Sequence, residues 1–199
     1  TRAAALDAQH RHPVGERPGA PIEGPRRGTD PARHELNMVF TFEHVDLDRV
    51  PGGHKWDLAP LELPMLKKNL AHWQEGLEEA GWNSLYWDNH DQPRAVSRFG
   101  DDSPEFRVVS AKTLATVLHL HKGTPYVYQG EEIGMTNAPF ATIEDYEDIE
   151  SINHYNLASA GGVPEETILH SLLVKSRDHA RTPMHWDASA NAGFTSGTP

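Results

Sequence analysis

The chain contains no cysteine and no long apolar run. The absence of cysteine among its 199 residues excludes disulfide bonds and thiol chemistry. No apolar stretch approaches the roughly 20 residues that a membrane-spanning helix requires. The first residues also lack the apolar core of a signal peptide. We therefore expect no membrane partner and a cytoplasmic location.

Positive charge is scarce as well. Lysine and arginine number 18 against 29 aspartates and glutamates, which gives a formal net charge of −11. Nucleic acids and anionic membranes are poor partners for such a chain, because their phosphates would repel it. A neutral substrate is compatible with this charge, whereas the oligomeric state cannot be derived from it.

The 13 histidines do not follow a metal-binding pattern. They are scattered, and only His10 with His12 and His119 with His121 lie close together. The second pair is two residues apart on a predicted helix, so its members face different sides. Neither pair has the spacing of a zinc site. We expect no metal and no other cofactor.

The chain divides at about residue 34. Residues 1–34 contain five prolines and four glycines and show no sustained period of 2 or 3.6 residues. This composition predicts an irregular leader with the remnant of a strand near 14–16, and it leaves a non-native origin open for residues 1–13. A more regular pattern fills residues 35–199.

Strands and helices alternate in the middle of the chain. Apolar runs and one-sided apolar patterns predict, in order, the elements 36–42 (strand), 61–80 (helix), 82–87 (strand), 107–122 (helix) and 124–128 (strand). Gly81 and Gly123 are expected to end the two helices. This alternation predicts an α/β fold with parallel strands joined by right-handed crossovers.

Each predicted strand ends in a cluster of polar residues, as strands do at the catalytic face of a (β/α)8 barrel. Three βα units are too few to close such a barrel, so the fold class is a partial barrel, roughly its last three to four units. Residues 143–155 are expected to form short helices over the rim, and 165–175 a further helix. We interpret the acidic run 144–150 as a solvated face.

The most informative segment is 84–94, where an apolar and aromatic run stops at a group of polar side chains. Asn89, His90, Asp91 and Arg94 are the kinds of group that bind hydroxyls and stabilise a developing positive charge. Their position at the end of a predicted strand holds them at the mouth of a sheet. This segment indicates carbohydrate chemistry.

Five segments carry a recognisable pattern. They are 14–19 (VGERPG), 42–48 (FEHVDLD), 89–94 (NHDQPR), 128–135 (YQGEEIGM) and 177–184 (RDHARTPM). In these segments the chain resembles the α-glucosidase and oligo-1,6-glucosidase branch of the α-amylase superfamily of retaining glycoside hydrolases. The resemblance covers roughly residues 14–199 and implies that 35–199 form the C-terminal half of a catalytic (β/α)8 barrel.

The resemblance also implies roles for single residues. Glu16 matches the family's general acid/base, and Asp91 matches the third carboxylate, which binds sugar hydroxyls and helps to distort the ring. His90 matches a histidine that hydrogen-bonds the same sugar. Arg177 matches an arginine that reaches the terminal glucose, and Arg181 is expected to support that loop.

The resemblance places the family's nucleophile, an aspartate, before the position of Glu16 and outside these residues. Retaining hydrolysis needs two carboxyl groups about 5–5.5 Å apart. We therefore expect the isolated chain to be inactive, and its parent to be an exo-acting hydrolase of α-1,6 or α-1,4 glucosidic bonds in short oligosaccharides. The linkage preference stays open.

Alternatives remain at the level of function and of single residues. The chain is either part of an α-glucosidase or a non-catalytic barrel fragment or relative that binds sugar or a protein partner. Asp91 is alternatively a cap of its turn, and Arg177 a salt-bridge partner of Asp178. Glu131 and Glu132 are more simply explained as structural anchors of the rim.

Overall fold

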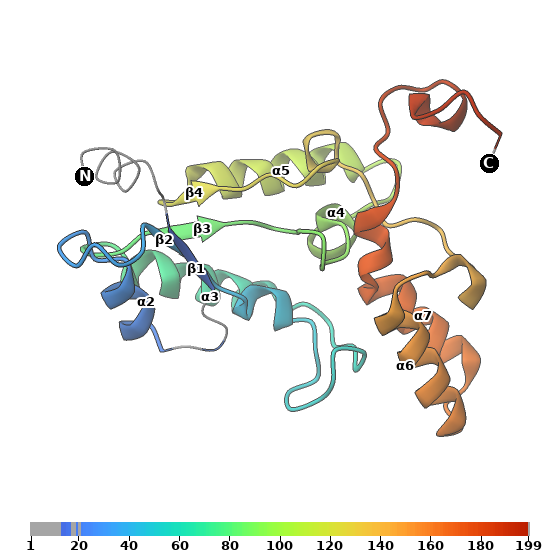
Figure 1. Cartoon of the computed structure of the whole chain (residues 1–199), viewed down its shortest axis with the longest axis horizontal. Coiled ribbons are helices and arrows are strands. Elements are labelled where there is room, and N and C mark those ends of the chain that lie inside the picture. The colour runs from blue at the N-terminus through green and yellow to red at the C-terminus, as the bar shows by residue number, and fades with distance from the viewer. Residues whose placement is uncertain (1–12, 17–18, 20, 199) are drawn as a thin grey trace, which may run out of the picture. The chain divides into compact units, whose positions relative to one another are not determined.

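The structure is a computed structural model that describes residues 13–16, 19 and 21–198 (Figure 1). Residues 1–12 of the predicted irregular leader, together with 17, 18 and 20, lie outside the described residues. Within the described part of the chain, no helix has both the length and the apolar character needed to cross a bilayer.

The chain divides into two compact units. The first, here called the sheet unit, contains the described residues up to Leu47, Leu61–Leu85 and Leu120–Tyr126. The second, here called the helical unit, contains Asp48–Pro60, Tyr86–His119 and the described residues from Val127 onward.

Four short strands form the sheet unit's parallel sheet, in the order β1-β2-β3-β4. They are β1 Val14–Glu16, β2 Met38–Phe40, β3 Asn83–Leu85 and β4 Thr124–Pro125. Each strand pairs in parallel with the next one along the chain. Parallel neighbours need a crossover connection, and every connection here contains at least one helix. The predicted alternation of parallel strands and helices is confirmed.

Part of the predicted irregular leader is ordered. β1 pairs with β2 through Glu16 and Phe40, and a short helix, α2 Glu23–Gly28, follows β1. The sequence pattern does not predict this helix, because a proline such as Pro25 usually argues against a helix. Pro25 lies in the first turn of α2, however, where a backbone N–H has no helical partner to lose.

The helix between β2 and β3, α3 Leu63–Gly76, ends before the predicted stop at Gly81. Lys122 Nζ donates to the backbone oxygens of Leu77 and Glu78, at 2.7 and 2.6 Å. These two carbonyls lie directly after the helix, so Lys122 holds the chain where it leaves α3. This contact comes from a residue far along the chain, so the local sequence does not reveal it.

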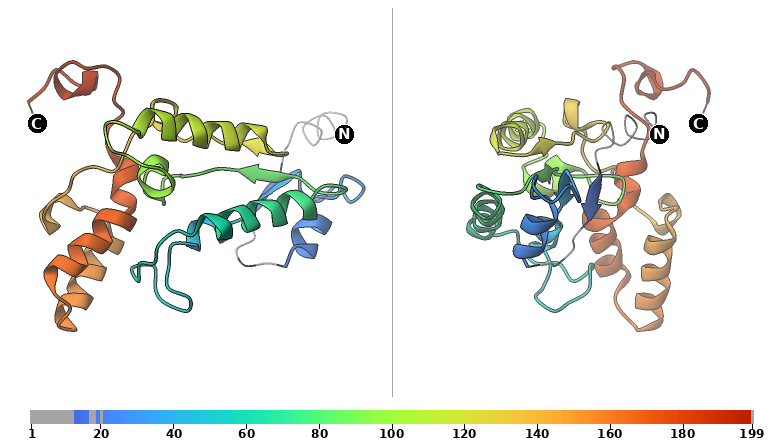
Figure 2. Two further views of the ribbon diagram at one scale, coloured as in Figure 1. Left: turned by 180° about the vertical axis from the view of Figure 1, so that it is seen from behind. Right: turned by 60° about the vertical axis from the view of Figure 1, so that its left-hand side comes forward.

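The helical unit holds α4 Ala95–Phe99, α5 Arg107–Leu120 as far as His119, α6 Ile149–Ala160 and α7 Glu165–Lys175. Helices α6 and α7 lie side by side (Figure 2). Ile168 and Leu172 of α7 form a buried core cluster with Tyr146. The predicted helices at 107–122 and 165–175 are confirmed, whereas α6 extends well past the short helices expected over 143–155.

A buried ion cluster fastens the 48–60 loop of the helical unit to α4 and α7. Both carboxylate oxygens of Asp48 lie 2.9 Å from guanidinium nitrogens of Arg98, and Lys175 Nζ also contacts Asp48. All three side chains are at least nine-tenths buried. Burial alone would raise the pKa of Asp48, but the two cations outweigh it and hold this pKa below its usual value.

Replacing Asp48 by asparagine is expected to lower the free energy of unfolding by about 3–5 kcal/mol, because two buried cations lose the charge that compensates them. Chemical denaturation at pH 7 measures the difference, with the exposed Asp102→Asn as a matched control. A lowered pKa contributes stability only while the carboxylate stays ionised. The difference should therefore shrink as the pH falls below the ordinary value of 3.8. Equal unfolding energies at pH 7 would contradict this role.

Candidate active site

The turn after β3 fixes its own backbone and presents two polar side chains. Asp88 is buried and accepts a hydrogen bond from the amide of Ala95 at 2.9 Å. Asn89 Oδ1 accepts from the amide of Asp91 at 2.8 Å, a local bond typical of tight turns. The side chains of His90 and Asp91 remain 71% and 44% exposed. The turn is thus held from within while these two groups face outward.

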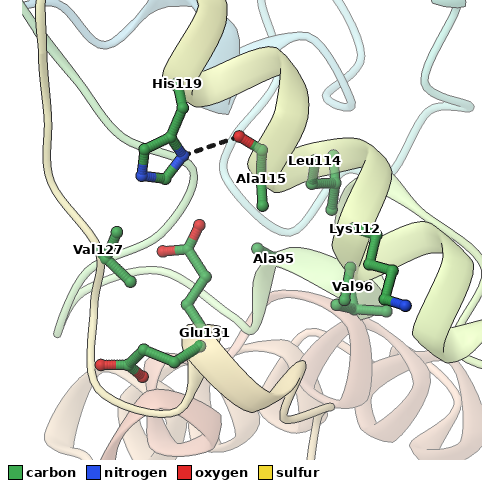
Figure 3. Close-up of a pocket in the computed structure, with 10 residues that line it drawn as sticks. Ala95, Val96, Lys112, Leu114, Ala115, His119, Val127 and Glu131 are labelled. Atoms are coloured by element: carbon green, nitrogen blue, oxygen red, sulfur yellow. Dashed lines mark hydrogen bonds between the residues drawn. The ribbon is translucent and has the colours of Figure 1, made fainter.

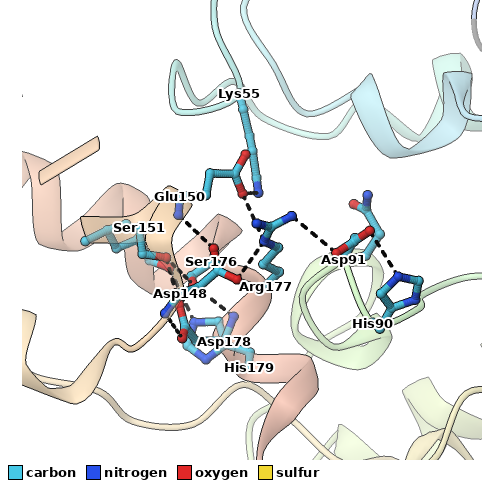
Figure 4. A network of polar contacts seen from close by, with 12 residues as sticks. Lys55, His90, Asp91, Asp148, Glu150, Ser151, Ser176, Arg177, Asp178 and His179 are labelled. Atoms are coloured by element: carbon cyan, nitrogen blue, oxygen red, sulfur yellow. Dashed lines mark hydrogen bonds and ion pairs between the residues drawn. The ribbon is translucent and has the colours of Figure 1, made fainter. Parts of the chain in front are cut away.

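Asp91 is surrounded by side-chain nitrogens of one histidine and two arginines (Figure 4). Its Oδ1 lies 3.3 Å from Arg177 Nη1 and 3.0 Å from Arg181 Nη2. Its Oδ2 lies 3.2 Å from His90 Nε2. These contacts orient the carboxylate and partly offset its charge. The structure therefore brings together four residues that the sequence analysis singled out in two distant segments.

A second carboxylate, Asp148, anchors the same arginines. Its Oδ2 accepts from Arg177 Nε at 2.8 Å and from Arg181 Nη1. Its Oδ1 accepts from the amide of Glu150 at 2.8 Å, which caps the start of α6. Burial would raise the pKa of Asp148, but these donors hold it below its usual value. Both arginines thus bridge Asp91 and Asp148.

The interpretation of 144–150 as a solvated face is wrong for Asp148, whereas Glu150 is partly exposed but ion-paired. Asp148 is only 7% exposed, and Glu150 Oε2 pairs with Lys55 Nζ at 2.5 Å. The sequence did carry one signal: an aspartate followed two residues later by an acidic residue, directly before an apolar-periodic segment, is typical of a helix N-cap. Their arginine partner was not visible, because it lies about 30 residues further along the chain.

Asp178 is not the partner of Arg177. Its Oδ2 accepts hydrogen bonds from the hydroxyl groups of Ser151 and Ser176, at 2.8 and 2.6 Å. Its Oδ1 accepts from the backbone amides of residues 147 and 148. Asp178 therefore fixes the start of α6 next to α7, and so positions Asp148 under the two arginines.

Arg94 and Asn89, both predicted to bind substrate, are used by the protein itself. Arg94 is 1% exposed. Its guanidinium donates to the backbone oxygens of His179 and Gln129 and to Thr182 Oγ1, at 2.9, 2.6 and 3.1 Å. These contacts indicate that Arg94 joins three loops and does not contact sugar, and that Asn89 shapes the turn.

Glu16 lies at the carboxyl end of β1, in the sheet unit. Its neighbour in register is Phe40 at the end of β2, and its side chain is exposed. In a parallel α/β sheet this end is the one that carries ligand-binding and catalytic groups. The role of Glu16 as general acid/base stays a prediction.

A pocket of about 780 Å³ adjoins Glu150 in the helical unit. Lys55 and Trp56 contribute to its wall from the 48–60 loop, and Glu150 and His154 from α6. The rings of Trp56 and His154 stack 4.4 Å apart. Glu150 Oε2 also lies 3.6 Å from Arg177 Nε. This pocket is not apparent from the sequence, because its residues come from two segments almost 100 positions apart.

The chemistry of this cluster suits a neutral polyhydroxyl ligand. Carboxylates accept hydrogen bonds from hydroxyl groups, and guanidinium groups donate to hydroxyl oxygens. Within the described ranges, no group of three or more histidine, aspartate or glutamate side chains has the arrangement of a metal site. The carboxylates and guanidinium groups of this cluster can bind hydroxyl groups through hydrogen bonds.

Comparison with known proteins gives consistent relatives. Residues 2–199 match the α-amylase catalytic domain. The oligo-1,6-glucosidase of Halalkalibacterium halodurans is 61% identical over 186 residues, which are 94% of this chain and 33% of that protein. The trehalose-6-phosphate hydrolase of Escherichia coli is 50% identical, over 94% of this chain and 33% of that protein.

Similar solved structures come from the same group of enzymes. Bacillus licheniformis trehalose-6-phosphate hydrolase superimposes with a TM-score of 0.88 at 49% identity, over 94% of this chain and 34% of that chain. Isomaltulose synthase from Klebsiella sp. LX3 superimposes with a TM-score of 0.87 at 39% identity, over 94% of this chain and 34% of that chain. The chain spans about a third of the length of these relatives. These matches confirm the prediction of a partial catalytic barrel, and the chain belongs to the α-amylase family.

Proposed function

We propose that the protein carrying this chain is a retaining, exo-acting α-glucosidase that hydrolyses α-1,6 or α-1,4 glucosidic bonds of short oligosaccharides. The observation that carries the proposal is the position of Asp91, which is oriented by His90, Arg177 and Arg181 and still 44% exposed. The similarity to oligo-1,6-glucosidases, at about 60% identity in several species, favours isomaltose-type substrates.

Asp91 acts on the transition state. Glycoside hydrolysis passes through an oxocarbenium-like state in which positive charge develops on the sugar ring. A carboxylate that accepts hydrogen bonds from the ring hydroxyls binds this state more tightly than the ground state, because the attraction grows with the charge. Arg177 and Arg181 hold the carboxylate in place, so the protein does not reorganise during the reaction.

Glu16 supplies the proton to the leaving group and later takes one from water. The nucleophilic carboxylate comes from a part of the protein that precedes these residues, by similarity to the family. The pocket beside Glu150 can take a sugar ring of an oligosaccharide, whose hydroxyl groups Lys55 and Glu150 can bind. The pocket volume of about 780 Å³ is large enough for one or more sugar rings.

A substrate panel tests the proposal. The protein that carries this chain together with the preceding nucleophile segment is assayed on isomaltose, maltose, trehalose 6-phosphate and sucrose. We expect the highest kcat/KM on isomaltose, with glucose released first as the α-anomer in a time course followed by proton NMR. The absence of glucose release from all four sugars would contradict the proposal.

A further inference from the structure

A buried carboxyl pair lies directly beside the turn that carries Asp91. Asp88 is 3% exposed, and its Oδ2 accepts from the amide of Ala95. Its Oδ1 is buried and has no standard hydrogen-bond donor among the described residues. A buried carboxylate oxygen without a donor is costly, so a proton supplied from nearby would stabilise this arrangement.

Glu131 offers that proton. It lies in the turn after β4, where its Oε2 accepts from the amide of Tyr128 at 3.1 Å, and its carboxyl group interacts with that of Asp88 as a hydrogen-bond partner. Two carboxyl groups can form such a bond only when one of them is protonated. Arg94 Nη1 donates to Gln129 O at 2.6 Å and ties the same two turns together.

The electrostatic surroundings favour a single shared proton. Burial raises the pKa of Asp88 to about 6, although the Ala95 amide and Arg94 oppose this rise. Burial and the charge of Asp88 raise the pKa of Glu131 to about 8, and the charge of Glu132 adds to the effect. Both rises favour one proton held by the pair near neutral pH, and the pKa of Glu131 is the one raised further.

Other titratable groups face the pair. Lys112 and His119 of α5 line a pocket of about 280 Å³ together with Glu131 and Glu132 (Figure 3). The charge of buried Arg94 acts on Asp88, and the Tyr128 ring lies 5.7 Å from the guanidinium carbon of Arg94. None of these groups removes the like-charge repulsion that would follow if both carboxyls were ionised.

We propose that Glu131 is a positioning residue which, as a neutral acid, donates a hydrogen bond to Asp88 and thereby fixes the turn that presents His90 and Asp91. Asp88 holds that turn through the Ala95 amide, and the Asn89 side chain closes it one residue later. The importance for catalysis rests on the proposed glucosidase function. The pH-dependent ordering of the turn does not depend on it.

The proposal has a defined pH dependence. A carboxyl whose pKa is raised by folding contributes stability that is complete below its unfolded pKa and is lost as the pH rises through the folded value. Ionisation of Glu131 near pH 8 leaves two negative charges in a buried site. The turn should then loosen, while the exposed acids of the surface remain unaffected in this range.

Nuclear magnetic resonance of the protein that carries this chain tests the proposal without any assay of turnover. The side-chain carboxyl carbon of Glu131 is expected to titrate near pH 8, and the amide signals of Ala95 and Asp91 to shift with the same midpoint. In Glu131→Gln the side-chain amide donates at every pH, so these amide shifts should disappear. Glu132→Gln, the matched control, should keep them at a slightly lower midpoint.

Asp88→Asn provides a second variant if Glu131→Gln does not fold. The asparagine oxygen accepts from the Ala95 amide, and its NH2 group donates to the Glu131 carboxylate. The shift of the Ala95 and Asp91 amide signals near pH 8 should therefore again be absent. A Glu131 carboxyl that titrates near its ordinary value of 4.5 overturns the proposal. Amide shifts that are identical in wild type and Glu131→Gln overturn it too.

Discussion

Replacing Asp91 by asparagine in the complete enzyme is expected to lower kcat/KM by at least ~10²–10³-fold. The change keeps the size of the side chain and removes the charge that opposes the positive charge of the sugar ring. The loss should fall mainly on kcat, because the interaction is strongest in the transition state. Initial-rate kinetics on isomaltose and on an aryl α-glucoside measure both constants.

The control for Asp91→Asn is Glu144→Gln, which removes one charge from an exposed acid of the rim. We expect its kinetic constants to stay within about twofold of wild type, since surface changes of this kind have small effects. Arg177 and Arg181 keep Asp148 as a partner in the Asp91 variant, so the site should stay folded. An Asp91→Asn enzyme with undiminished kcat would refute the catalytic role of this carboxylate.

The polypeptide of 199 residues alone is expected to release no product from 4-nitrophenyl α-glucoside above the uncatalysed background. Retaining hydrolysis needs two carboxyl groups about 5–5.5 Å apart, one as the acid and one as the nucleophile. Glu16 fills the first role in our proposal, and the family's nucleophile precedes it in sequence. Without the nucleophile no glycosyl-enzyme intermediate can form.

The isolated chain is compared with a longer protein that includes the preceding segment, at equal concentration and over hours. The Glu16→Gln variant separates the chain's own activity from that of a contaminating glucosidase. Turnover by the short chain contradicts the prediction if Glu16→Gln abolishes that turnover. Loss of that activity in Glu16→Gln would mean that another carboxylate of this chain acts as the nucleophile.

The fold was largely predictable because its signals are local. Alternating apolar runs and one-sided helical patterns are properties of short windows, so the parallel strands and helices α3, α5 and α7 could be read from them. The chain's course after the end of α3 was not predictable, because Lys122 binds the carbonyls of Leu77 and Glu78 there from a distant position. Short α2 was hidden by a proline that its first turn tolerates.

The site was predictable only where its residues lie close together in sequence. His90 and Asp91 follow directly from the end of an apolar run, whereas the burial of Arg94 depends on acceptors from residues 129, 179 and 182. A sequence shows that an arginine is charged but does not show what surrounds it. Asp148 was missed for the same reason, since its arginine partners belong to another segment.

A crystal structure of the protein that carries this chain, with glucose or isomaltose bound, tests the central claim most directly. We expect an Asp91 carboxylate oxygen within 2.6–3.2 Å of at least one ring hydroxyl of the terminal sugar, with Arg177 and Arg181 still bound to Asp91 and Asp148. A bound sugar that makes no contact with Asp91 or His90 would contradict the account.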